Sequence, residues 1–152
     1  MKKIGITGSL ASGKTTASKI LSKNKGPLFS ADIIVKKIYK NVKLTKKISK
    51  VLGVPKSKNF KTEIKKKVLQ NRKLLRKLEN VIHRIVRKEM TLFIKKNDNK
   101  KFIFLEIPLL IESKLTRYFD IIIFIKSSKK LRLKRYIKKF DKGVRLFEIL
   151  DK

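Results

Sequence analysis

The sequence predicts an α/β fold in which helices cover both faces of a sheet of parallel strands. Short apolar runs bounded by turn residues are typical of buried strands, and the clearest are "IGIT" at 4–7, "FIFLEIPLL" at 102–110 and "DIIIFI" at 120–125. Segments with apolar residues at helical spacing lie between these runs. Strands separated by helices usually form a parallel sheet, with ligands at the carboxyl ends of the strands.

The first elements follow one another closely. A strand over 1–7 ends at Gly8, and the following segment "GKTTASKILSK" predicts a helix with Ala17, Ile20 and Leu21 at apolar positions. "PLFS" at 27–30 predicts a second short strand, and "ADIIVKKIYK" predicts the helix after it. The expected order is therefore strand, glycine loop, helix, strand, helix.

The segment from 42 to 97 shows no strand pattern. A helix over 44–52 should end at Gly53 and Pro55, and a longer helical stretch should break near Asn71. Further helices are expected over 127–140 and 144–152. We therefore expect a core made of 1–40 and 98–152, interrupted by a helical insertion at 41–97.

Composition narrows the function classes. The 152 residues suit one domain, and 43 Lys and Arg against 11 Asp and Glu give a formal net charge of +32. Such a charge attracts any polyanion, although an AT-rich coding sequence would also enrich Lys. The absence of Cys excludes disulfides and thiolate metal sites, and a lone His excludes a His-rich zinc site. The sequence has no apolar segment long enough to span a membrane, so we expect a cytoplasmic protein with no membrane partner.

The stretch "GSLASGKT" at 8–15 fits the pattern G-x-x-x-x-G-K-[ST] in the strand-to-helix context that a P-loop requires. The loop backbone and the helix N-terminus would cradle ATP phosphates, Lys14 would reach the β- and γ-phosphates, and the Thr15 hydroxyl would ligate Mg²⁺. The fold class is therefore a P-loop NTPase α/β/α core. The predicted nucleotide-binding residues are Gly8, Ala11, Ser12, Gly13, Lys14, Thr15 and Thr16.

Two carboxylates are candidates for the chemistry. Asp32 follows the second strand, where it could act as the base for an acceptor hydroxyl; the alternative is that it caps the next helix. Glu106 lies inside an apolar strand, where an unpaired carboxylate is costly. We predict that Glu106 binds Mg²⁺ or its water, with a structural salt bridge as the alternative.

Four stretches together resemble the dephospho-CoA kinase family: "TGSLASGKTT", "SADIIVKKIY", "LENVIHRIVRKEM" and "LEIPLLIESKL". The resemblance covers nearly the whole chain, and the last two stretches are much narrower signals than the P-loop. It implies ATP-dependent phosphorylation of the ribose 3′-hydroxyl of dephospho-CoA. It also implies that the insertion binds CoA and that a lid helix lies near 127–145.

The resemblance assigns substrate-binding residues. Asp32 matches the second acidic position of an Asp-x-Asp element, in which Ser30 replaces the first Asp. His83 and Arg87 match a His-Pro-x-x-Arg element, with Arg84 in place of the Pro. Glu112, in the loop beyond Pro108, is also predicted to bind substrate, although a residue at such a position is more often a solvated surface residue.

The resemblance assigns further catalytic residues. Glu106 stands where the family has Asp, Arg135 matches an Arg that reaches the ATP phosphates, and Lys139 stands where the lid normally carries a second Arg. The predicted catalytic set is therefore Asp32, Lys14, Arg135 and Lys139. Family members usually continue beyond the lid into a fifth strand and a final helix near the adenine, so we expect about four strands here, with the fifth strand missing.

Two other interpretations stay open. Another P-loop small-molecule or nucleotide kinase would share Lys14 and Thr15, but not "IPLLIE". A catalytically reduced basic P-loop protein could bind nucleic acid, although no stacking pattern of aromatic residues or DNA-reading motif accompanies the Lys residues. The preferred interpretation is a monomeric or weakly oligomeric kinase with dephospho-CoA, ATP and Mg²⁺ as its ligands and no specific nucleic-acid partner.

Overall fold

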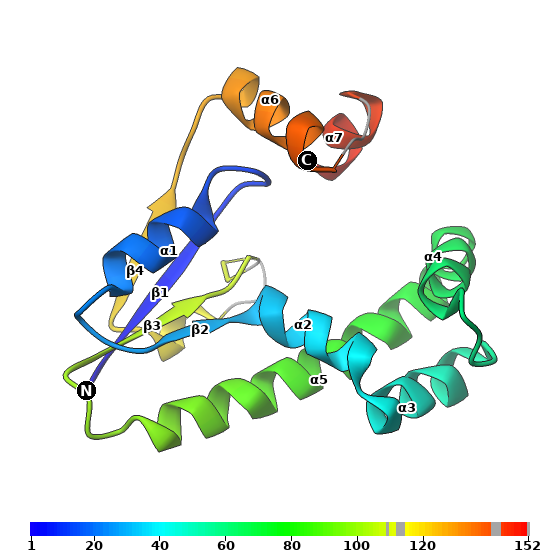
Figure 1. Ribbon diagram of the computed structural model, residues 1–152, viewed down its shortest axis with the longest axis horizontal. Helices are drawn as coiled ribbons and strands as arrows, with labels where there is room; N and C mark the ends of the chain where they lie inside the picture. Colours follow the sequence, from blue (N-terminus) through cyan, green and yellow to red (C-terminus); the bar gives the residue numbers. More distant parts are fainter. Residues whose placement is uncertain (109, 112–114, 141–143, 152) are drawn as a thin grey trace. The chain divides into compact units, whose positions relative to one another are not determined.

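A parallel sheet forms the centre of the first part of the chain. The computed structural model describes residues 1–108, 110–111, 115–140 and 144–151. Among these residues, four strands form one sheet in the order β2-β3-β1-β4, and every pairing is parallel (Figure 1). The strands are β1 (Lys2–Gly8), β2 (Leu28–Ser30), β3 (Phe102–Glu106) and β4 (Ile121–Ile125). Strand β3 is shorter than the apolar run that predicted it.

The strand register brings the carboxyl ends of β1, β2 and β3 together. Glu106 is the Cα partner of both Ile6 and Ser30. The opposite end of β1 is held by Asp120, whose Oδ2 accepts a hydrogen bond of 2.7 Å from the backbone N–H of Lys3. This hydrogen bond holds the pKa of the Asp120 carboxyl below its usual value. The end of the sheet that carries the P-loop is thus also the end where Glu106 lies.

Helix α1 (Lys14–Ser22) packs on the sheet through an unexpected face. The buried residues of α1 are Ser18 and Ser22, whereas Ile20 is 67% exposed. The predicted apolar position of Ile20 was therefore wrong. Small serine side chains let the helix backbone approach the strands closely, and the partly buried Leu21 fills the remaining space against Ile4, Ile6 and Phe104.

The middle of the chain is helical, as the sequence predicted. It contains α2 (Ala31–Lys40), α3 (Val42–Leu52), α4 (Phe60–Gln70) and α5 (Arg72–Lys96). Gly53 ends α3, and Asn71 separates α4 from α5. The Asn71 side chain accepts hydrogen bonds from the N–H groups of Lys73 and Leu74, which fixes the start of α5.

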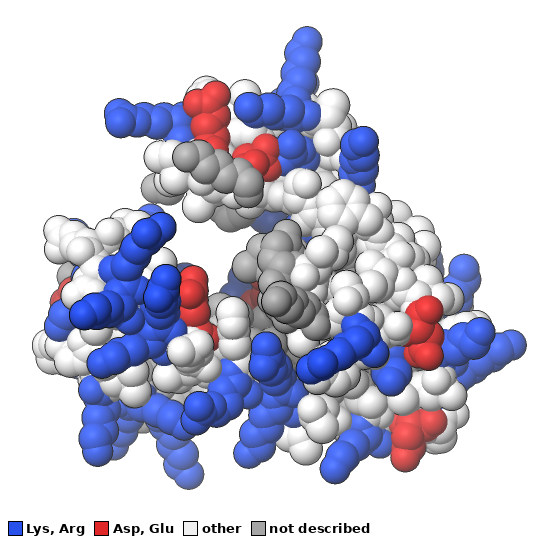
Figure 2. All heavy atoms as spheres, turned by 180° about the vertical axis from the view of Figure 1, so that it is seen from behind, with Lys and Arg blue, Asp and Glu red and all other residues white. Residues whose placement is uncertain are grey.

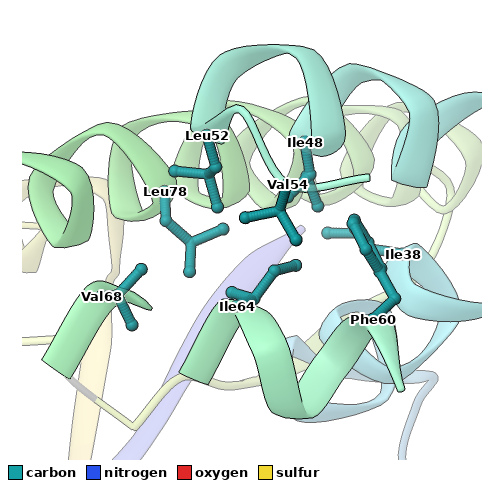
Figure 3. Packing of buried hydrophobic residues seen from close by; sticks show 8 residues of the cluster. All are labelled: Ile38, Ile48, Leu52, Val54, Phe60, Ile64, Val68 and Leu78. Carbon is teal, nitrogen blue, oxygen red and sulfur yellow. The ribbon is translucent and has the colours of Figure 1, made fainter. Parts of the chain in front are cut away.

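These helices enclose a hydrophobic core of their own. Figure 3 shows eight buried side chains converging from α2, α3, α4, α5 and the loop after α3: Ile38, Ile48, Leu52, Val54, Phe60, Ile64, Val68 and Leu78. The described chain accordingly divides into two compact units, Met1–Ala31 with Ile94–Lys152, and Asp32–Phe93. The sequence placed the boundaries at 40/41 and 97/98, which assigns most of α2 to the other unit.

Replacing Ile48 with Ala should destabilise the helical unit by about 2–5 kcal/mol, because Ile48 is fully buried and its truncation leaves a cavity. Leu69→Ala is the matched control, since Leu69 of α4 is 74% exposed and its loss should change stability by less than about 0.5 kcal/mol. Urea denaturation followed by circular dichroism measures both. Equal effects of the two substitutions would contradict the packing in Figure 3.

The surface is dominated by positive charge. Figure 2 shows Lys and Arg side chains far outnumbering Asp and Glu on the face drawn, as the net charge of +32 requires. No helix among the described residues combines the length and the apolar character needed to cross a membrane.

Candidate phosphate-binding site

The loop between β1 and α1 has the backbone of a phosphate cradle. Gly8 and Gly13 have φ angles of 151° and 101°, values that strain an L side chain. A Cβ at Gly8 would also lie 2.3 Å from the backbone oxygen of Ile125. Both glycines are thus required for the turn, and Gly8 is also required for the close approach of the loop to β4.

Lys14 folds back over this loop. Its Nζ donates hydrogen bonds of 2.8 Å to the backbone oxygens of Gly8 and Ser9. The ammonium group is therefore held over the concave side of the loop from the first turn of α1. A cation held there can exchange loop carbonyls for phosphate oxygens.

A hydroxyl and a carboxylate meet beside the loop. Thr15 Oγ1 donates a hydrogen bond of 2.6 Å to Glu106 Oε1, joining α1 to the end of β3. Glu106 is 1% exposed, and its Oε2 has no hydrogen-bond partner among the described residues. Mg²⁺ prefers oxygen ligands and usually takes only one or two from a protein when it binds with phosphates. Thr15 and the orphaned carboxylate oxygen fit that requirement, and the pairing favours the predicted metal role over a salt bridge.

Helix α6 (Lys129–Phe140) supplies a second cation to the loop. Arg135 Nη1 donates a hydrogen bond of 3.0 Å to the backbone oxygen of Ser12. Ser127, which lies between β4 and α6, donates its hydroxyl to the same oxygen at 3.4 Å. A Cβ at Gly13 would lie 3.3 Å from Arg135 Nη1, so the side chain lies closely against the loop.

The structure thus brings together part of the predicted site: the P-loop residues, Thr15, Glu106 and Arg135. Lys139 is exposed on α6, and Asp32 is exposed in the first turn of α2, in the helical unit. His83 and Arg87 are exposed one turn apart on α5. Glu112 lies outside the described residues.

Sequence reasoning missed Ser127 and Arg132. Arg132 Nε donates a hydrogen bond of 3.2 Å to the backbone oxygen of Ser127. Arg132 and Arg135 are three residues apart, so they are neighbours on one face of a helix. This spacing could have indicated that Arg132 lies close to the phosphate site.

Comparison with known proteins identifies the family. The family profile for dephospho-CoA kinase matches residues 2–145. The chain belongs to the dephospho-CoA kinase family. The dephospho-CoA kinase of Rickettsia typhi is 38% identical over 148 residues, which cover 97% of this chain and 76% of that protein. The dephospho-CoA kinase of Fusobacterium nucleatum is 33% identical over 141 residues, which cover 90% of this chain and 72% of that protein.

Solved structures agree with the family and the fold. The dephospho-CoA kinase from Campylobacter jejuni matches with a TM-score of 0.62 and 28% identity over 97% of this chain and 77% of that one. The Thermus thermophilus protein TT1252 matches with a TM-score of 0.83 and 20% identity over 98% of this chain and 78% of that one, a likeness of fold. The predicted family and α/β P-loop fold are thereby confirmed, as is the enzyme class, a kinase that uses ATP with Mg²⁺.

Proposed function

We propose that this protein transfers the γ-phosphoryl group of ATP to the ribose 3′-hydroxyl of dephospho-CoA, giving coenzyme A and ADP. Family membership supports the reaction, and the observation that carries the proposal is the pairing of Thr15 with the buried Glu106 beside an intact P-loop. The relatives described above are dephospho-CoA kinases, so they do not support the interpretation as another small-molecule kinase.

The loop residues hold and orient the phosphoryl donor. Backbone N–H groups of the loop and of the start of α1 bind phosphate oxygens, with Lys14 at the β- and γ-phosphates and Arg135 on the side of α6. Mg²⁺, when bound by Thr15 and Glu106, neutralises charge on the phosphate oxygens. Lys139 contributes a further positive charge, but it cannot form the bidentate contact of an Arg.

Asp32 acts as the base. It lies two residues after Ser30, which is the last residue of β2. Ser30 is paired with Glu106 of the neighbouring strand β3. The carboxylate takes the proton of the acceptor hydroxyl while the oxygen of that hydroxyl bonds to the γ-phosphorus. The bond from that phosphorus to the bridging oxygen breaks, and ADP leaves with the electron pair.

The helical unit binds the acceptor. His83 and Arg87 are four residues apart on α5, so their side chains lie on one face and both are exposed. A guanidinium group beside an imidazole suits the phosphates of dephospho-CoA. Glu112 stays a proposed substrate contact. We infer a cytoplasmic enzyme that is monomeric or weakly associated and has no specific nucleic-acid or membrane partner.

A phosphoryl-transfer assay tests the function. Purified protein with Mg-ATP is given dephospho-CoA, AMP or adenosine, and products are separated by chromatography. Formation of coenzyme A well above the phosphorylation of the other acceptors supports the proposal. Preference for AMP would favour a nucleotide kinase, and ATP binding with no transfer would favour a reduced P-loop protein.

Glu106→Gln should raise the Mg²⁺ concentration required for half-maximal rate about tenfold or more, because the amide keeps the shape of the side chain but removes a negative charge from the metal site. Glu148→Gln is the matched control, since Glu148 is exposed on α7 (Val144–Leu150). Magnesium titrations of the transfer rate measure the effect. An unchanged Mg²⁺ requirement would contradict a metal-binding role for Glu106 and leave it as a structural acceptor for the Thr15 hydroxyl.

A further inference from the structure

A buried ion pair joins α6 to the segment after α7. Arg132 Nη1 is paired with Asp151 Oδ1, and the two side chains are only 12% and 8% exposed. The pair lies beside an aromatic contact between Tyr136 and the fully buried Phe147, whose ring centroids are 5.4 Å apart. Figure 1 shows α6 and α7 side by side. An ion pair this buried costs stability if either partner is removed, so it fixes the position of α6 against α7.

The same guanidinium group reaches toward the P-loop. Arg132 Nε donates to the backbone oxygen of Ser127, and the Ser127 hydroxyl donates to the backbone oxygen of Ser12. Arg135, one turn further along α6, donates to that same oxygen. Ser12 is therefore held from two directions by a segment whose geometry depends on Arg132. A chain of hydrogen bonds thus runs from Asp151 through Arg132 and Ser127 to Ser12.

We propose that Arg132, held by Asp151, is a positioning residue for the phosphate site. It does not touch the nucleotide: it fixes the turn at Ser127 and the orientation of α6, so that Arg135 is placed on the P-loop before ATP arrives. A planar guanidinium group can satisfy Asp151 and Ser127 at once through different nitrogens, whereas a Lys ammonium group is a single point charge. This inference rests on the proposed function only where kcat and KM are measured, because nucleotide affinity can be measured without phosphoryl transfer.

The decisive variant is Arg132→Lys, which keeps the charge opposite Asp151 but should lose the contact with Ser127. Arg145→Lys, at an exposed position of α7, is the matched control. We expect Arg132→Lys to weaken binding of ADP and of a non-hydrolysable ATP analogue about tenfold, within the range of coupling between contacting residues, and to change the thermal midpoint little. Arg145→Lys should match the wild type in both measurements.

A double-mutant cycle separates positioning from general structural support. If Arg132 acts through Arg135, the affinity lost in Arg132→Lys should disappear when Arg135 is already Ala, so the double variant should bind nucleotide as Arg135→Ala does. Multiplicative losses, or an unchanged affinity in Arg132→Lys, would overturn the proposal. Calorimetric titration supplies these affinities without any transfer step, so the cycle gives its answer even if the wild type makes no coenzyme A.

Where transfer is measured, the same cycle is repeated on kcat and on KM for ATP. A misplaced Arg135 should lower kcat/KM for ATP and leave KM for dephospho-CoA unchanged. Asp151→Glu should restore most of the affinity that Asp151→Ala loses, because a carboxylate remains within reach of Arg132. Two outcomes would overturn the positioning role. One is an equal rise in KM for ATP and for dephospho-CoA, and the other is a fall in kcat that only follows the fraction of folded protein.

Discussion

Lys14→Ala should lower the rate of coenzyme A formation by about 10²–10³-fold or more, the effect expected when a charged donor to a transferring phosphoryl group is removed. The side chain lies over the loop, donating to the backbone oxygens of Gly8 and Ser9, and those carbonyls should give way to phosphate oxygens when ATP binds. Initial rates at saturating dephospho-CoA, together with ATP affinity, measure the loss.

The control for this variant is Lys19→Ala, because Lys19 is exposed on the same helix and carries the same charge. With a net charge of +32, any lysine removal slightly weakens the general attraction of ATP, and the control measures that contribution. Because Lys14 also contacts the loop backbone, Lys14→Met and a thermal midpoint show whether the loop stays folded. A Lys14→Ala protein that keeps most of the wild-type rate would contradict the proposed phosphate site.

Local rules predicted much of the fold because the deciding residues are local. Gly8 and Gly13 are required by the backbone angles of the loop, and Gly53 and Asn71 mark helix boundaries within a few residues of the helices they limit. The hydrophobic core of the helical unit also follows from helical spacing, and the packing of Leu21 against Ile4, Ile6 and Phe104 follows from apolar runs in the strands. Such features need no knowledge of distant parts of the chain.

The features that sequence reasoning missed depend on distant partners. Ile20 is exposed because the sheet accepts the small face made by Ser18 and Ser22, and helical spacing alone cannot decide between two adjacent faces. The pairing of Arg132 with Asp151 spans 19 positions. With 43 cationic side chains and 11 acidic ones, composition does not indicate which cation each carboxylate meets. The partner of Glu106 was predictable only as a class, because burial demands compensation without naming its source.

Asp32→Asn should leave ATP affinity near the wild-type value and lower kcat by about 10²–10⁴-fold, the range for a positioned general base. The substitution is chosen because Asn has nearly the same size and shape as Asp but carries no charge and cannot act as a base. Removing the charge in the first turn of α2 should cost no more than about 1 kcal/mol of helix stabilisation. Asp32 is the second residue of α2 and so does not cap the helix as the alternative supposed. A purely structural role in the first turn therefore predicts nearly full activity, and a catalytic role predicts almost none.

Asp98→Asn is the matched control for Asp32→Asn, since Asp98 is an exposed carboxylate in the loop after α5. ATP affinity by calorimetry and single-turnover transfer to dephospho-CoA give the two quantities separately. Transfer at the wild-type rate in Asp32→Asn would remove Asp32 from the mechanism, while loss of ATP affinity would assign it to nucleotide binding. Intact ATP binding with lost transfer would place the missing step on the acceptor hydroxyl, because P-loop residues such as Lys14 are unchanged in this variant.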